Sequence, residues 1–310
     1  MNWQNIVRSL RNGTGLLLLA GLVNSCGNNS AEVAPDTKDS GVIHISVDES
    51  FKPVIDSQIQ VYESSYPKTK IIAHYKPEAD CLKDMLVDSI RMIITTRGYS
   101  PKEEEVISDS LKVDPSMRVL AYDAVAVIVH PQAPDSMFTM GEIKDLLTGR
   151  GFKDKTPVFD GLKATSTVRF ILDSVLRGDS LTPRAEAAQS SEGVIDYVAK
   201  NPKAIGFIGI SWIGNRDDST QLTFLQKVKV AHIESTDRPG GYVQPVQANI
   251  YYRRYPMVRD LVYILKEKHR GLGRGFANFM MADRGQLIFR RAYLMPAFLT
   301  FTLRDANLTE

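Results

Sequence analysis

Cysteine is scarce in this sequence, whose 310 residues include only Cys26 and Cys81. Two thiols cannot form a disulfide framework, and a structural zinc site normally needs four Cys or His ligands. The five histidines are scattered without an HxxxH pair: His44, His74, His130, His232 and His269. The sequence therefore predicts neither a metal centre nor a bound cofactor.

A large charge of one sign is also missing. The formal net charge is +2. Arg8 and Arg11 account for this excess, so the chain beyond residue 25 has equal numbers of basic and acidic side chains. Proteins that bind nucleic acids carry clustered positive charge to neutralise phosphates. We therefore predict no nucleic-acid partner.

The N-terminal apolar run, residues 15–23, is too short to cross a membrane. It has nine residues, whereas a spanning helix needs about 20. A short apolar run behind a basic start, here Arg8 and Arg11, is typical of a secretory signal peptide. We predict that residues 1–25 are such a peptide and that the mature protein lies in the periplasm or cell envelope.

Cys26 ends the sequence Leu22-Val-Asn-Ser-Cys, which resembles the cleavage site of a bacterial lipoprotein, although Asn24 departs from the usual small residues. On this interpretation Cys26 is acylated and anchors the protein to a membrane. The polar residues 26–40 then form a tether without a core of its own. A plain secretory peptide with an incidental cysteine is the alternative.

Beyond residue 41, short apolar runs alternate with segments of helical periodicity, which predicts an α/β fold with largely parallel sheets. Two strand-like stretches, Leu120–Val129 and Tyr242–Tyr251, are expected to cross between two lobes. Val258–Leu265 is expected to be helical. Lobe one then comprises residues 41–121 and 250–310, lobe two comprises residues 122–249, and a ligand lies in the cleft between them.

Ser and Thr residues stand where three predicted elements begin or end. Ser50-Phe51 follows the first strand, Thr165-Ser166-Thr167 opens a helix, and Thr96-Arg97 closes a third strand. Free N–H groups at a helix start, with hydroxyls beside them, suit an oxyanion. Arg97 and Lys163 are the candidate cations. Simple N-capping explains each feature alone.

Four segments, taken in order, resemble the phosphate-binding proteins of bacterial ABC phosphate importers. They are Tyr122-Asp-Ala-Val-Ala-Val-Ile-Val-His-Pro131, Met140-Gly-Glu-Ile-Lys-Asp-Leu-Leu-Thr-Gly149, Ala204-Ile-Gly-Phe-Ile-Gly-Ile210, and Ala282-Asp-Arg-Gly-Gln-Leu-Ile288 with Leu294-Met-Pro296. The resemblance covers most of the mature chain. It implies a two-lobed α/β fold of the periplasmic-binding-protein-like type II, with each lobe a mostly parallel sheet and two crossing strands between them.

The resemblance also implies ligand residues. The first-lobe pair of the family corresponds to Ser50-Phe51, its Ser-Gly-Thr loop to Thr165-Ser166-Thr167, and its turn after the third strand to Thr96-Arg97. The family's Arg upstream of the Ser-Gly-Thr loop has no match. Lys163 is the nearest cation and would have to replace it.

Asp48 and Glu49 stand where the family commonly has small residues, and Glu78 raises the same question. A carboxylate there can accept a hydrogen bond from a protonated phosphate oxygen, which would reject sulfate. It can equally repel any oxyanion, or point into solvent. These three interpretations stay open at the level of sequence.

The predicted function is that of a monomeric, non-enzymatic solute-binding lipoprotein, which captures inorganic phosphate or a related oxyanion for a membrane transporter permease. An envelope interaction protein with the same fold and a degenerate anion site is the first alternative. A hydrolase is the second, although no nucleophile–base pair is visible as a motif.

Overall fold

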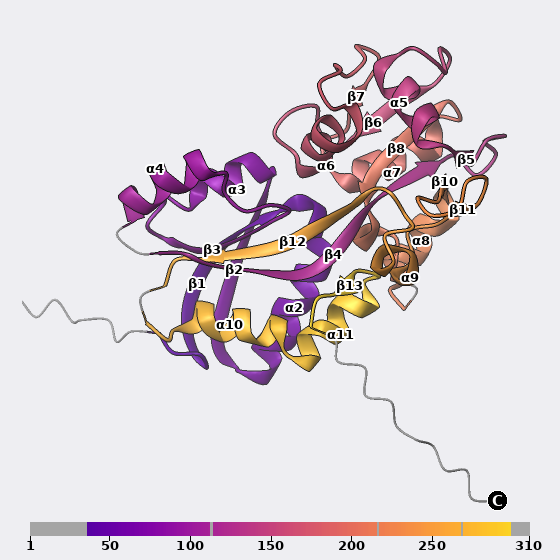
Figure 1. The fold of residues 1–310 in the computed structure, drawn as a ribbon. Coiled ribbons are helices and arrows are strands. Elements are labelled where there is room, and N and C mark those ends of the chain that lie inside the picture. Colours follow the sequence, from indigo (N-terminus) through magenta and orange to yellow (C-terminus); the bar gives the residue numbers. More distant parts are fainter. Residues whose placement is uncertain (1–35, 112–113, 216, 268, 299–310) are drawn as a thin grey trace, which may run out of the picture. The chain divides into compact units, whose positions relative to one another are not determined.

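A computed structural model describes residues 36–111, 114–215, 217–267 and 269–298. Helices and strands alternate along most of this part of the chain (Figure 1). The predicted signal peptide and Cys26 lie outside the described residues. The predicted α/β class is confirmed.

The N-terminal part of the described chain builds a parallel sheet in the order β2-β1-β3. Its elements are β1 (Ser40–Asp48), the 3-10 helix η2 (Glu49–Phe51), α2 (Lys52–Ser65), β2 (Lys68–Lys76), α3 (Glu78–Asp84), β3 (Ile90–Thr95) and α4 (Pro101–Leu111). Alternate β1 residues, such as Ile43 and Ile45, are buried on the side of α2. Helices α3 and α4 cover the opposite face of the sheet (Figure 1).

The middle of the chain adds a second parallel group in the order β8-β6-β7. Its elements are β4 (Ser116–Val129), β5 (Met137–Phe138), α5 (Met140–Thr148), β6 (Thr156–Phe159), α6 (Ser166–Phe170), the π-helix η3 (Ile171–Leu176), β7 (Glu186–Ala187), α7 (Ser191–Lys200), β8 (Ala204–Gly209) and η4 (Ile210–Trp212). Thr139 and Glu142 form a capping box at the start of α5.

The remaining elements return the chain to the first group of strands. They are α8 (Ser219–Lys227), β9 (Lys229–Val230), β10 (His232–Glu234), β11 (Tyr242–Val243), α9 (Gln247–Tyr251), β12 (Val258–Leu265), α10 (Leu272–Met281), α11 (Asp283–Arg291) and β13 (Met295–Pro296). The main sheet has the order β2-β1-β3-β12-β4-β8-β6-β7, and β11-β10-β5 forms a small separate sheet.

Strand β4 joins the two parallel groups. Its first part pairs antiparallel with β12, and its last part pairs antiparallel with β8. Leu120 and Ala121 belong to the apolar cluster under β1–β3, whereas residues 124–129 belong to the cluster under β6 and β8. We call the parts of the fold built on these two strand groups the first half and the second half. The predicted lobe boundaries remain a prediction.

The prediction of a helix over Val258–Leu265 is wrong, because this segment is strand β12. Leu261, Tyr263 and Leu265 contact one apolar cluster and Ile264 another. A strand buried on both faces has no polar alternation to distinguish it from a helix.

The predicted crossing strand Tyr242–Tyr251 is also wrong. This stretch contains the short strand β11 and helix α9, separated by Pro245. Proline removes a backbone donor and interrupts a strand ladder. The second connection between the halves is β12, which leads from Met257 in the second apolar cluster to Leu261 in the first.

Candidate functional site

The end of β1 places Ser50 in the interior. Asp48, the last β1 residue, caps η2: its Oδ1 accepts a hydrogen bond of 3.0 Å from the Ser50 N–H. Asp48, Ser50 and Phe51 are all buried. The turn from strand to 3-10 helix therefore carries a hydroxyl and a carboxylate into the same buried region.

The start of α6 brings a second set of hydroxyls to this region. Thr165 is the N-cap, and its Oγ1 accepts a hydrogen bond of 3.3 Å from the Val168 N–H. Ser166 and Thr167 follow and are fully buried. The Oγ atoms of Ser50 and Ser166 lie 3.3 Å apart, so the structure brings together these two predicted site segments from opposite halves.

Arg259 of β12 supplies a cation that the sequence analysis did not identify. Its Nε donates to Asp123 Oδ2 at 2.8 Å, and its NH1 donates to the hydroxyls of Ser166 at 3.0 Å and Thr167 at 3.4 Å. The residue is only 4% exposed, and its NH2 has no hydrogen-bond partner in the described part of the chain. A Cβ on Gly209 would lie 3.2 Å from NH2, so glycine there leaves room for the guanidinium.

One sequence signal could have indicated this pair. Asp123 and Arg259 interrupt apolar stretches, and fully buried charges are rare unless they are paired. Sheet register places the two residues directly opposite each other on β4 and β12. That register is non-local, so the sequence alone could not match the partners.

The two cations chosen from the sequence lie elsewhere. Both NH groups of Arg97 bond Glu103, at 2.7 and 2.9 Å. Hydrogen bonds from Arg97 lower the pKa of Glu103 to about 2. Lys163 is exposed on the loop before α6. Neither side chain joins the Ser50–Ser166 region.

Thr96 and Glu78 form a contact between the halves with Arg169 of α6. Glu78 Oε1 accepts from the Thr96 N–H at 2.8 Å and its hydroxyl at 2.6 Å, while Arg169 Nε donates to Glu78 Oε2 at 2.6 Å. Burial opposes ionisation of Glu78, but the Arg169 charge and hydrogen bonds hold its pKa below the ordinary value. An ionised Glu78 therefore links α3 to α6.

Two further contacts join the halves beside this ion pair. Glu49 Oε2 accepts from the Ser191 hydroxyl at 2.8 Å, and Oε1 from the Ser191 N–H at 3.2 Å at the start of α7. The Ala79 N–H donates to the Ala164 carbonyl at 3.1 Å. Ala164 has φ of 69°, a conformation in which L-residues are strained and which often occurs at functional loops. The halves therefore meet through the chain's own polar groups.

Glu78→Gln is expected to lower the free energy of unfolding by about 1–3 kcal/mol, because it removes charge-assisted hydrogen bonds from a buried group. Glu103→Gln is the matched control, since it breaks the more exposed Arg97 pair within one half, a change worth about 0–1 kcal/mol. Urea unfolding of both variants measures the difference. Equal losses would contradict a linking role for Glu78.

Carboxylates are abundant around Arg259. Burial, then repulsion by Glu78, raises the pKa of Asp48 to about 7. Burial, then repulsion by Glu49, raises the pKa of Asp160 to about 6. One buried oxygen each of Asp48, Asp123 and Asp160 has no partner among the described residues. Beside the free donor of Arg259, the site therefore also offers free acceptors, a combination that suits an oxyanion carrying a proton.

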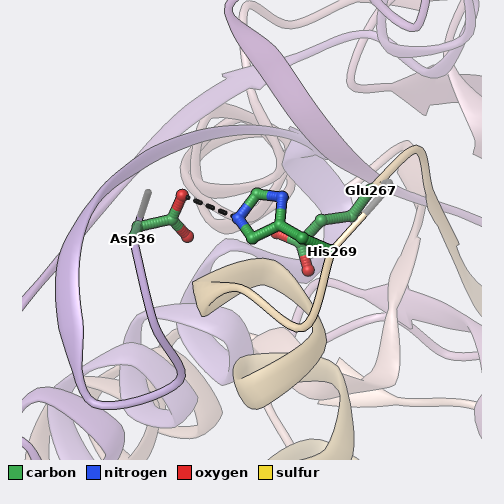
Figure 2. Close-up of side chains that lie close together, drawn as sticks. All are labelled: Asp36, Glu267 and His269. Atoms are coloured by element: carbon green, nitrogen blue, oxygen red, sulfur yellow. Dashed lines mark hydrogen bonds and ion pairs between the residues drawn. The ribbon is translucent and has the colours of Figure 1, made fainter. Parts of the chain in front are cut away.

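A separate group of ligating side chains comprises Asp36, Glu267 and His269 (Figure 2). Their carboxylates are already engaged. Arg91 NH2 lies 2.6 Å from both Asp36 and Glu267, and the Leu272 and Gly273 N–H groups donate to the same two acids at 2.6 and 3.0 Å. The group therefore caps the start of α10 and balances the charge of Arg91, rather than presenting open ligand positions.

This α/β fold, with its buried polar site between two halves, is that of the periplasmic-binding-protein-like class. The chain belongs to the PBP superfamily, because the sequence model of the PBP superfamily domain matches residues 32–284. A search of curated protein sequences found no match. Within the described residues, no helix has the length and apolar character needed to cross a membrane.

Solved structures share the fold. One is described as a phosphate ABC transporter substrate-binding protein with bound phosphate from Clostridium perfringens; it is 19% identical, with a TM-score of 0.69, over 83% of this chain and 100% of that one. An ABC-type phosphate transport receptor from Vibrio cholerae is 16% identical, with a TM-score of 0.61, over 82% and 99%. PstS from Borrelia burgdorferi is 19% identical, with a TM-score of 0.51, over 83% and 99%.

Proposed function

We propose that this protein is an extracytoplasmic solute-binding lipoprotein that captures inorganic phosphate between its two halves and delivers it to a membrane transporter permease. The observation that carries the proposal is the buried Arg259 guanidinium, whose NH2 has no hydrogen-bond partner among the described residues and which lies beside the hydroxyls of Ser166 and Thr167. Arginine suits the tetrahedral arrangement of phosphate oxygens. The ligand is bound and released without chemical change.

Asp48 supports phosphate over sulfate. Its Oδ2 is buried without a partner in the described chain, and a buried unsatisfied acceptor is costly. The hydroxyl of a protonated phosphate supplies the missing donor, whereas sulfate at neutral pH has none. Of the three interpretations of Asp48 left open by the sequence, the buried acceptor fits its position, because the side chain does not point into solvent.

Transport is supported by the relatives. The Vibrio cholerae protein is a phosphate transport receptor, and the Clostridium perfringens structure holds phosphate. Both match this chain over more than four fifths of its length. A shared fold with a buried cation and hydroxyls at the junction of the halves supports the same class of cargo here.

A second candidate is an envelope interaction protein that keeps the fold and binds no anion. The direct contacts of Ser50 with Ser166 and of Glu49 with Ser191 favour it, because protein groups there bond one another. This candidate predicts that the protein binds no oxyanion and that a pull-down recovers a protein partner.

Calorimetric titration separates the two candidates. The processed chain carrying Cys26→Ala is unfolded, dialysed and refolded to remove carried-over anion, and is then titrated with phosphate and with sulfate. We expect phosphate to bind and sulfate to be silent. If correctly refolded protein binds neither phosphate nor sulfate, the transport proposal is excluded and the interaction protein is favoured.

The hydroxyl variant Ser166→Ala with Thr167→Val tests the site itself. It should weaken phosphate binding by about 1–3 kcal/mol for each lost hydrogen bond, since both hydroxyls accept from Arg259 and face the same buried region. Thr182→Val is the control, because that buried hydroxyl lies outside the site and, among the described residues, accepts only from the Arg184 N–H. Unchanged affinity in the double variant would place the ligand elsewhere.

Cys26→Ala tests the anchor. If Cys26 is acylated, a high-salt wash should release the variant from the membrane fraction but leave the wild-type protein bound, because salt screens contacts between charges and does not extract an inserted acyl chain. Metabolic labelling with a fatty acid should mark the wild-type protein and not the variant. Labelling of both proteins would contradict acylation at this position.

A further inference from the structure

A basic groove of about 860 Å³ runs along α10, between the end of α2 and the start of α11. We call it the α10 groove. Its lining includes four cations, Lys38, Arg270, Arg274 and Arg284, against the single carboxylate of Asp283. The groove lies outside the Ser50–Ser166 site, on the face of the first half that α2 and α10 cover (Figure 1).

The three arginines of the groove have no salt-bridge partner within the described residues, and Lys38 contacts only the neighbouring Asp39, at 3.6 Å. Elsewhere in the described chain, three buried or half-buried arginines each bond a carboxylate: Arg91, Arg169 and Arg259. The groove therefore carries positive charge that the described protein leaves unbalanced, on a protein whose overall charge is nearly neutral.

Aromatic rings also line the groove, namely those of Tyr62, Tyr66 and Phe279. The Tyr62 ring lies 4.9 Å from that of Tyr66 and 5.3 Å from that of Phe279, and the Lys38 ammonium lies 5.5 Å from the Tyr66 ring centre. Tyr66 and Phe279 are half-buried. Arginines and aromatic rings that line one groove form a combination that suits the headgroup region of an anionic membrane.

The position of Asp36 fixes where the N-terminal segment joins the fold. Asp36 Oδ2 accepts from the Leu272 N–H at 2.6 Å, and Arg91 contacts the same carboxylate. His269 also contacts this carboxylate (Figure 2). This junction lies at the first turn of α10, and the next turn lines the groove. Asp36 lies ten positions after Cys26, so the fully extended connection spans at most about 35 Å.

We propose that the α10 groove is a contact surface for the anionic phospholipid headgroups of the membrane that holds the lipid anchor. The inference rests on the lipoprotein part of the proposed function, because the short connection to Cys26 keeps the groove near the bilayer. The positive charge comes from side chains, since Asp36 and Glu267 already cap the N–H groups at the start of α10. Phosphate headgroups of anionic lipids match the unpaired arginines.

Vesicle sedimentation tests the proposal. The processed chain carrying Cys26→Ala, which has no acyl chain, is mixed in phosphate-free buffer with vesicles of phosphatidylcholine alone or of phosphatidylcholine with phosphatidylglycerol. Binding is expected only to the anionic vesicles, and added salt should weaken it. The triple variant Arg270→Gln, Arg274→Gln, Arg284→Gln should partition about a hundred-fold less, because each arginine near such a surface contributes on the order of 1 kcal/mol.

The matched control removes three exposed cations from the second half, through Lys153→Gln, Lys203→Gln and Arg238→Gln. This variant has the same net charge as the groove variant and should keep nearly all its vesicle binding. An equal loss of vesicle binding in both variants would mean that only net charge matters, and would overturn the proposal. Failure of the wild-type protein to bind either kind of vesicle would also overturn it. Inorganic phosphate and chloride are then compared, at equal ionic strength, for how well they displace the protein from vesicles. Equal displacement supports a lipid-binding surface. Stronger displacement by phosphate would mean that the groove binds free phosphate, and would overturn the proposal.

The vesicle result is independent of the cargo. If calorimetry detects no phosphate binding while the groove variant loses vesicle binding, phosphate is rejected as the ligand and the membrane-contact proposal is supported. If Cys26 is not acylated but the groove binds anionic vesicles through its arginines, the lipid-anchor hypothesis is rejected. The groove is then the membrane contact that remains proposed for the protein. Failure of the groove variant to differ from the control counts against the groove alone.

Discussion

Arg259→Gln is expected to abolish phosphate binding and to lower the free energy of unfolding by about 3–5 kcal/mol. The binding effect follows because Arg259 is the fully buried cation beside the hydroxyls of Ser166 and Thr167. The stability effect follows because the variant leaves Asp123, which is 0% exposed, without its ion pair. Titration calorimetry and urea unfolding measure the two effects on one preparation.

Asp123→Asn separates the two contributions. In the Arg259→Gln background it removes the stranded negative charge, so the double variant should regain part of the lost stability, as coupled partners do in a double-mutant cycle. Phosphate binding should not return, because the cation is still absent. A double variant that binds phosphate would show that Arg259 acts only through the fold.

Asp48→Asn is expected to change how stability depends on pH. The pKa of Asp48 is raised from 3.8 to about 7 by burial and by repulsion from Glu78, so between these values the folded state holds a proton that the unfolded state has lost. Wild-type stability therefore falls as pH rises through this window. Relative to wild type, the variant should gain about 2–4 kcal/mol between about pH 4 and pH 8.

Urea unfolding of both ligand-free proteins across that pH range measures this difference. Asp84→Asn is the control, because Lys76 and Ser46 outweigh burial and lower the pKa of Asp84, which gives the opposite sign. Asp48→Asn should also narrow the discrimination between phosphate and sulfate, since the buried acceptor becomes an amide. A pH profile parallel to that of wild type would mean that Asp48 is ionised throughout.

The sequence predicted the parts of the site that depend on local geometry. A strand that ends in Asp48 and continues into a helical turn places Ser50 at that turn, and the Thr165 cap places Ser166 and Thr167 in the first turn of α6. Capping is encoded over three or four residues, so a single sequence is enough to locate it. The predicted ligand site already combined these two turns, which meet in the structure through Ser50 and Ser166.

The cation could not be found in the same way. Arg259 acts because β12 pairs with β4 in the register that sets it opposite Asp123, more than a hundred residues away, and an apolar strand buried on both faces gave no periodic signal. Arg97 shows the opposite case. Its partner Glu103 is six residues away and also exchanges capping-box hydrogen bonds with Ser100, so a local ion pair already occupies the Arg97 guanidinium.

Arg259 and Asp123 lie on β12 and β4, the two strands through which the chain passes between the halves. If the halves rotate apart about this strand pair, points on the pair move little, whereas Ser50 and Ser166 travel with their own halves. Opening would then break the bond from Arg259 to Ser166 but keep the bond to Asp123. On the proposed function, the guanidinium would then stay near the axis of rotation and meet the incoming anion before the hydroxyls do, so that binding to Arg259 would precede closure of the halves and release would occur in the reverse order.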